Sequence, residues 1–206
     1  MSLRPRPAVV VADVSDLPTV VFGHRQIIWW GTIGFMIVES MTLVVCLASW
    51  FYLRRNFDTW PPPGTPEPDL LLGTVSTLVL LLTAVPYTLA DRAAKRLDIP
   101  GTRRWLWGGT AATAFATAFR FLEFDAVGTT FDASAYGSVI WAILVTHFTL
   151  LVVDLFETGT AAMVFTRGRQ EPKHFPDASD NALYSYFLVI AWVPAYVVVY
   201  LLPRWM

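Results

Sequence analysis

Five long apolar segments dominate this sequence and decide what it can fold into. Each is long enough to cross the hydrocarbon core of a membrane, which takes about 20 residues at the helical rise. A strand in lipid would leave its backbone polar groups unpaired, so the segments must be helices. The sequence therefore predicts an all-α membrane protein with five transmembrane helices, at about 27-53, 70-91, 104-124, 136-165 and 183-202.

The composition agrees with a lipid environment and excludes a nucleic-acid partner. Of the 206 residues, 55% are hydrophobic and 15% are charged, and the formal net charge is -1 at pH 7. Binding to a polyanionic backbone needs a positive face, and the sequence contains no basic tract to supply one. We expect a single five-helix transmembrane domain over residues 27-206, preceded by a cytoplasmic N-terminal extension over residues 1-26.

The lysine and arginine residues are distributed unevenly between the two ends of the predicted helices. If the N-terminus is in the cytoplasm, eleven of them lie on the inside and three lie on the outside. Lysine and arginine are enriched in the cytoplasmic loops of membrane proteins. The distribution therefore predicts an N-terminus inside and a C-terminus outside.

Six ionisable side chains fall within the apolar segments, where a charge is costly and is usually retained for function or for pairing. These candidate site residues are Glu39, Arg120, Glu123, His147, Asp154 and Glu157. Glu39 lies near the middle of the first segment, and we expect its carboxyl group to be protonated or turned toward a polar partner within the protein. This position favours a functional role for Glu39.

The spacing of the other five residues predicts two groups. Arg120 and Glu123 are three residues apart, so they share a helix face and can pair with each other. We expect them near the outer end of the third helix, as an interfacial ion pair or a contact to lipid headgroups. His147, Asp154 and Glu157 fall on one broad stripe of the fourth helix, which we expect to face protein rather than lipid.

The sequence carries no motif for catalysis or for cofactor binding. It lacks a glycine-rich phosphate loop, a nucleophile elbow and a zinc-binding helix motif. His24 and His174 lie outside the predicted helices, so ligation of a haem by this chain alone would depend on His147 and little else. We therefore expect a chain with no catalytic residue, metal or cofactor of its own.

Four motifs of the first helix and the following loop stand in a characteristic order: Trp-Trp-Gly at 29-31, Val-Glu-Ser at 38-40, Phe-Tyr-Leu-Arg at 51-54 and Trp-Pro-Pro at 60-62. This order resembles cytochrome c oxidase subunit III, in which Glu39 would match a buried membrane glutamate. The resemblance extends over about residues 27-202, and the length is similar to the five-helix bacterial form. Leu150 stands where the family usually has a second histidine, so the chain resembles a divergent member.

The resemblance implies a non-catalytic accessory subunit of a haem-copper terminal oxidase in aerobic respiratory electron transport. Such a subunit stabilises the catalytic subunit and supports proton uptake and the access of lipid and oxygen. The implied partners are the catalytic subunit, subunit II and membrane lipids of the bacterial inner membrane, including bound phospholipid, with haem and copper held by the partner subunits. Two alternatives remain open, an accessory subunit of a nitric oxide reductase system and a small proton-coupled transporter.

Overall fold

The computed structural model describes residues 17–168 and 171–205, so most of the predicted N-terminal extension lies outside the described residues. The described part is helical, and a short 3₁₀ turn, Gly23–Arg25, precedes the first long helix. The long helices are α1 (Ile27–Asn56), α2 (Leu70–Lys95), α3 (Ile99–Ala126), α4 (Ala135–Arg167) and α5 (His174–Tyr196). A π-helical turn (Val197–Leu201) and α6 (Leu202–Trp205) continue α5 to the end of the described chain.

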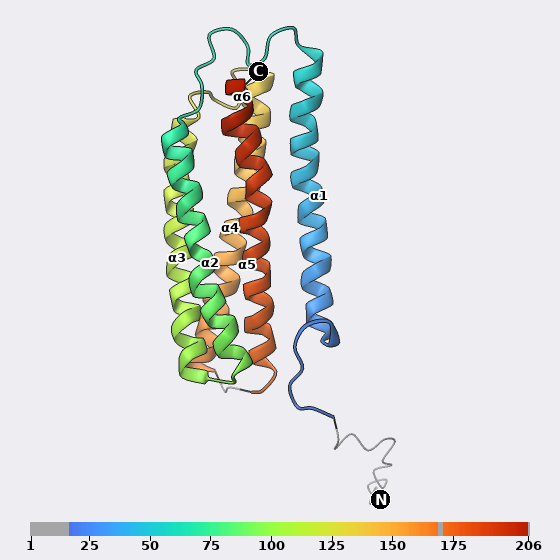
Figure 1. Cartoon of the computed structure of the whole chain (residues 1–206), viewed down its shortest axis with the longest axis vertical. Helices are drawn as coiled ribbons and strands as arrows, with labels where there is room; N and C mark the ends of the chain where they lie inside the picture. Colours follow the sequence, from blue (N-terminus) through green and yellow to red (C-terminus); the bar gives the residue numbers. More distant parts are fainter. Residues whose placement is uncertain (1–16, 169–170, 206) are drawn as a thin grey trace, which may run out of the picture.

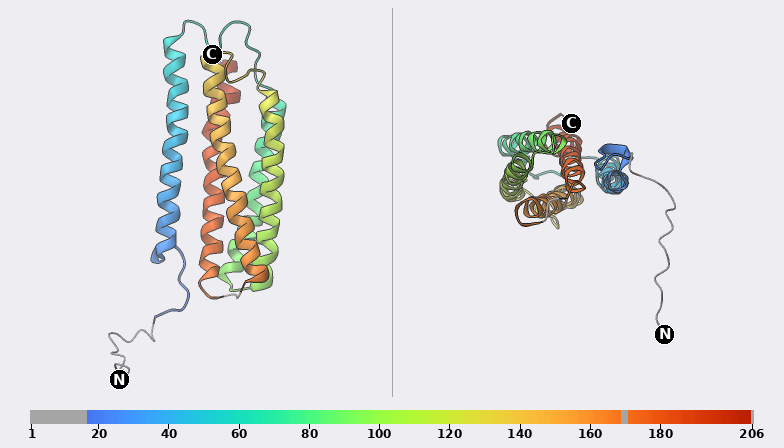
Figure 2. Two further views of the ribbon diagram at one scale, coloured as in Figure 1. Left: turned by 180° about the vertical axis from the view of Figure 1, so that it is seen from behind. Right: turned by 90° about the horizontal axis from the view of Figure 1, so that it is seen from below.

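Four of the long helices form a bundle, and the fifth stands beside it. Consecutive helices run in opposite directions, and α2 to α5 surround a common axis (Figures 1 and 2). α1 lies outside this ring and packs against α4 and α5. Most of the surface of α1 is therefore left open in the isolated chain.

The helices have the length and composition of a multi-pass membrane protein. Among the described residues, α1, α2, α4 and the continuous segment from α5 to α6 are long and apolar enough to cross a membrane. α3 is as long as the others, with 28 residues, but glycine, alanine, threonine and charged residues lower its apolar character. The prediction of five long helices is confirmed, whereas the crossing of α3 and the orientation of the termini stay predictions.

Short polar side chains begin three of the helices. The carboxylate of Asp69 accepts hydrogen bonds from the first backbone amides of α2, and Asp98 and Ser134 do the same for α3 and α4. These groups satisfy amides that have no partner within the helix. α5 begins at His174 instead of near residue 183, because its polar first turns pack into the bundle, where Asn181 is buried.

An aromatic cluster fastens the loop between α1 and α2 to the bundle. Trp60 in this loop is buried, and its ring centroid lies 6.0 Å from that of Trp50 on α1 and 5.3 Å from that of Tyr136 on α4. Both ring pairs are near-perpendicular edge contacts, an arrangement that aromatic rings favour. The cluster holds the C-terminal half of α1 against α4 although few other side chains of α1 are buried.

Candidate functional site

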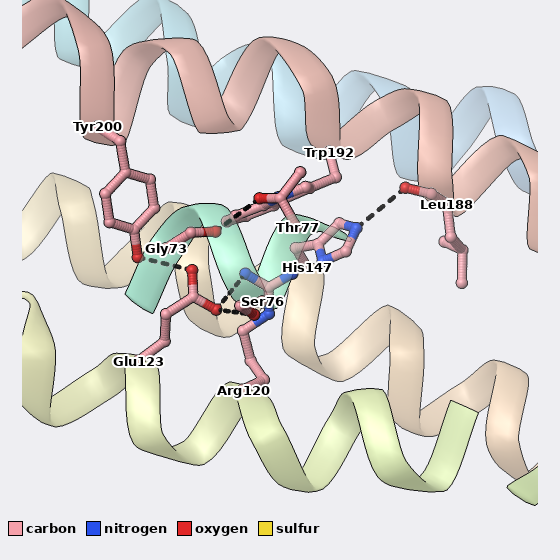
Figure 3. Close-up of polar contacts among 9 residues, drawn as sticks. All are labelled: Gly73, Ser76, Thr77, Arg120, Glu123, His147, Leu188, Trp192 and Tyr200. Carbon is pink, nitrogen blue, oxygen red and sulfur yellow. Dashed lines mark hydrogen bonds and ion pairs between the residues drawn. The ribbon is translucent and has the colours of Figure 1, made fainter. Parts of the chain in front are cut away.

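The interior of the α2–α5 bundle contains an ion pair that is almost completely removed from solvent. Arg120 and Glu123 of α3 are 1% and 0% exposed, and Nη1 of Arg120 lies 2.6 Å from Oε2 of Glu123. Ser76 of α2 donates a hydrogen bond to the same carboxylate oxygen, and the Tyr200 hydroxyl donates to the other, each at 2.6 Å (Figure 3). The carboxylate thus binds three helical segments together.

An indole ring lies against the guanidinium group of this pair. The Cζ atom of Arg120 is 3.7 Å from the ring centroid of Trp192, which is a cation–π distance. The indole nitrogen of Trp192 donates to Thr77 Oγ1 at 2.8 Å, so the ring is fixed in place (Figure 3). His147 packs beside the same indole, and its Nε2 lies 3.1 Å from the carbonyl oxygen of Leu188. We call the following set of residues the arginine network: Ser76, Thr77, Arg120, Glu123, His147, Trp192 and Tyr200.

Gly73 of α2 allows Tyr200 to reach Glu123. A Cβ atom at position 73 would fall on the Tyr200 ring, within 2.7 Å of its Cδ1 atom. The phenol belongs to the π-helical turn Val197–Leu201, in which Val198, Val199 and Tyr200 are all buried. The absence of a side chain at Gly73 is therefore a condition for this hydrogen bond.

Gly73→Ala is expected to lower the free energy of unfolding by about 1–2 kcal/mol, because the added methyl group forces Tyr200 away from Glu123. Denaturant titration of the purified protein in detergent measures this change. Gly31→Ala on α1 is the matched control, since a Cβ atom there meets no other atom within 4 Å. An equal loss in both variants would contradict the proposed close approach.

Asp154 of α4 organises a second interior network. Its Oδ2 atom accepts hydrogen bonds from the Tyr87 hydroxyl at 2.8 Å and from Thr113 Oγ1 at 3.2 Å, and its Oδ1 atom accepts from Ser185 Oγ at 2.7 Å. The donors belong to α2, α3 and α5, so this one carboxylate contacts every other helix of the bundle. Asp154 itself is 2% exposed.

Two further side chains extend this second network, around Asp154, toward the start of α5. The side chains of Thr158 and Asn181 exchange hydrogen bonds at 3.0 and 3.1 Å, and Thr158 Oγ1 also lies 3.0 Å from the Tyr87 hydroxyl. Both residues are buried. The polar first turns of α5 are therefore internal, which explains why this helix begins earlier than its apolar segment.

Glu39 forms a polar contact between α1 and α5 of the bundle. Glu39 is 6% exposed, and its Oε1 atom accepts a hydrogen bond from the Tyr184 hydroxyl of α5 at 2.9 Å. Its Oε2 atom is buried and has no hydrogen-bond partner among the described residues. Glu39 is thus turned toward a polar partner within the protein, which is one of the two arrangements expected from the sequence.

Tyr184→Phe is expected to lower the free energy of unfolding by about 1–2 kcal/mol, because it leaves the buried Glu39 carboxyl group without its donor. Thermal unfolding of the purified protein measures the loss. Tyr52→Phe is the control, since Tyr52 lies on the same helix as Glu39 and is 70% exposed. If the two variants unfold alike, the hydrogen bond between α1 and α5 contributes nothing to stability.

Glu157 does not join the other polar residues of α4. The predicted stripe holds for His147 and Asp154, which are buried, whereas Glu157 lies on the exposed surface. Three residues correspond to about 300° around a helix, so Glu157 is rotated by about 60° from Asp154. This rotation carries its side chain out of the bundle and onto a face shared by α4 and α5.

The prediction for Arg120 and Glu123 is confirmed in its pairing, whereas the expected contact with an interface or with lipid headgroups is wrong. The pair lies inside the bundle and not at an interface with lipid headgroups, because α2 and the π-helical turn close over it. The two networks also contain uncharged residues that sequence reasoning missed, namely Ser76, Tyr87, Thr113, Asn181, Ser185 and Tyr200. Hydroxyl groups within the apolar segments were the available signal for all of these except Asn181, which precedes the predicted fifth segment, and a single sequence does not show which of them meet.

The two networks join neighbouring helices of the bundle. Among residues 17–168 and 171–205, no three His, Cys, Asp or Glu side chains are grouped as a metal site. The acidic groups accept hydrogen bonds from neighbouring helices, and the guanidinium group is neutralised within the bundle. Such networks fix the relative positions of helices in a membrane, where apolar contact alone gives little specificity.

Comparison with known proteins identifies the family. No protein-family model matches the chain. It is 31% identical over 179 residues to the probable cytochrome c oxidase subunit 3 of Mycobacterium tuberculosis, which covers 82% of this chain and 85% of that protein. It is 26% identical to cytochrome c oxidase subunit 3 of Synechocystis sp., over 87% and 78% of the two chains, and 23% identical to that of Thermostichus vulcanus, over 84% and 87%. The chain belongs to the cytochrome c oxidase subunit 3 family.

Proposed function

We propose that this protein is a non-catalytic accessory subunit of a haem-copper oxidase that acts in aerobic respiratory electron transport. The match to proteins named cytochrome c oxidase subunit 3 over most of the chain carries this proposal. The interior of the bundle is consistent with it, since the carboxylates of Glu123 and Asp154 accept hydrogen bonds from neighbouring helices. Haem and copper belong in this proposal to the catalytic subunit and subunit II, which are the partners of the chain.

In the proposed arrangement all five long helices cross the bacterial inner membrane, with the N-terminus in the cytoplasm. The excess of lysine and arginine at one end of the helices supports this orientation. α3 crosses with the others in this proposal, because its 28 residues span about 42 Å and the ion pair near its C-terminal end is buried within the bundle. The internal pairing of Arg120 removes the main objection to placing α3 in the bilayer.

The accessory role consists in stabilising the catalytic subunit and in supporting proton uptake and the access of lipid and oxygen. The open surface of α1 supports a role in contacts with lipid or with another subunit, because an apolar helix with one buried stripe has room for further neighbours. Glu39 is the candidate residue for the part in proton uptake, since one of its oxygen atoms is buried without a partner among the described residues.

The proposal is tested by isolating the protein with its natural partners. Membranes are extracted in mild detergent, the complex is captured through a tag on this chain, and a reduced-minus-oxidised optical spectrum is recorded together with oxygen uptake. Haem bands with oxygen uptake are the expected result. Haem bands with nitric oxide reduction and without oxygen uptake would favour the nitric oxide reductase system, and a haem-free protein that moves protons in liposomes would favour a transporter.

A further inference from the structure

A groove on the outside of the bundle lies between α4 and the beginning of α5. It has a volume of about 570 Å³ and is walled mainly by apolar side chains, including Val153, Phe156 and Val164 of α4. Phe156 lines this groove and is 71% exposed. His174 and Asp177 line the end of the groove nearest the connection between α4 and α5, and Glu157 lies within it.

In the proposed membrane arrangement, Glu157 lies at the depth of the hydrocarbon core. α4 has 33 residues and is therefore about 50 Å long, whereas the hydrocarbon core is about 30 Å thick. Glu157 is six residues from the midpoint of α4 at Leu151, which is about 9 Å along the axis. That is less than half of the core thickness, so a helix centred in the bilayer holds this carboxyl group among acyl chains.

Within residues 17–168 and 171–205, no side chain compensates this carboxyl group. No hydrogen bond or ion pair joins Glu157 to the described residues, and its ionisable neighbours among them are the acids Asp154, Glu39 and Asp180. Lys173, near the same end of α4, pairs with Glu171 at 2.7 Å. An exposed acid at this depth is costly unless a neighbouring molecule pairs with it.

We propose that this groove is the docking site for a transmembrane helix of a neighbouring oxidase subunit that carries a basic side chain opposite Glu157. The inference rests on the proposed function. A phospholipid would place its headgroup at the end of the groove, near His174 and Asp177, and its acyl chain beside Glu157. Because an acyl chain has no hydrogen-bond donor, charge complementarity at Glu157 selects a protein helix over a lipid.

The dimensions of the groove suit such a helix. From Val153 to Val164 its wall extends over twelve residues, a rise of about 16 Å or three helical turns. Thr160 and Ala161 give the wall two small side chains within the span, which allow a second helix to approach closely. The partner helix therefore packs along the wall and meets Glu157 about one third of the way from Val153 to Val164.

The test places a photoreactive benzoylphenylalanine at Phe156 in the complete oxidase complex. Phe115 on α3 is the matched control position, since it is 59% exposed and does not line the groove. After irradiation, the expected adduct at position 156 is a transmembrane peptide of another subunit that contains lysine or arginine, and it is missing at position 115. Glu157→Leu should lower the adduct yield about three- to tenfold, the range for one polar contact between membrane helices, while Glu157→Asp keeps it within about twofold.

Three results would overturn the docking inference: an adduct with lipid alone, an adduct with a second copy of this chain, or a peptide adduct whose yield Glu157→Leu leaves unchanged. The thermal unfolding temperature of Glu157→Leu is measured alongside and should equal that of the unaltered protein. If haem copurifies and only lipid is cross-linked, the docking inference fails while the accessory-subunit proposal stands. If the unaltered chain brings down no haem protein, the accessory-subunit proposal itself fails.

Discussion

Replacing Arg120 with leucine is expected to lower the free energy of unfolding by about 3–5 kcal/mol, the cost of leaving one member of a buried ion pair without its partner. The reason is the complete burial of Glu123, which keeps its two hydroxyl donors but loses the charge that balances it. The Trp192 indole also loses the cation that packs on its face. Denaturant titration in detergent micelles and the amount of protein in the membrane both measure the effect.

A double variant separates charge from packing. Arg120→Leu combined with Glu123→Gln removes both charges and keeps an oxygen that can accept from Tyr200. Replacing both members of a buried pair costs far less than breaking it, so the double variant should regain more than half of the lost stability. If the double variant is as unstable as Arg120→Leu alone, the guanidinium group acts through its packing against Trp192 and not through its charge.

The helices could be predicted from the sequence because each depends on a local property. An apolar segment of sufficient length specifies a helix in lipid whatever its neighbours are, and Asp69 and Ser134 begin α2 and α4 near the predicted positions through contacts within one turn. α3 begins at Ile99, five residues before its predicted start, because Asp98 caps it ahead of the apolar segment. The predicted start of α5, near residue 183, was wrong because the true start at His174 depends on a contact that is not local. The polar side chain of Asn181 is stabilised by Thr158, 23 positions away in the chain, and a local pattern contains no information on that contact.

The site could be predicted only in part, because burial of a polar group depends on helices that are distant in sequence. The pairing of Arg120 with Glu123 follows from their spacing, but their location depends on Ser76 and Tyr200, 47 and 77 positions from Glu123. Sequence spacing gives the angle between two side chains on one helix. It does not show which angle faces the bundle axis.

Asp154→Leu is expected to lower the free energy of unfolding by about 2–4 kcal/mol, because it leaves the hydroxyl groups of Tyr87, Thr113 and Ser185 without their common acceptor. The loss stays below the sum of three hydrogen bonds, since Tyr87 can still bond to Thr158. Asp154→Asn keeps the shape and one acceptor oxygen, and it should cost about 1 kcal/mol. Thermal and denaturant unfolding of the isolated protein give both values.

Glu157→Leu is the informative control, because this acid is three positions from Asp154 and yet lies outside the bundle. Its effect on the stability of the isolated protein should stay within about 0.5 kcal/mol, as expected for a surface position. The two acids should thus differ in kind: Asp154→Leu weakens the chain by itself, and Glu157→Leu weakens its contact with a partner helix. An equal loss of stability in both variants would mean that Glu157 faces the interior of the protein in the membrane, contrary to the groove geometry.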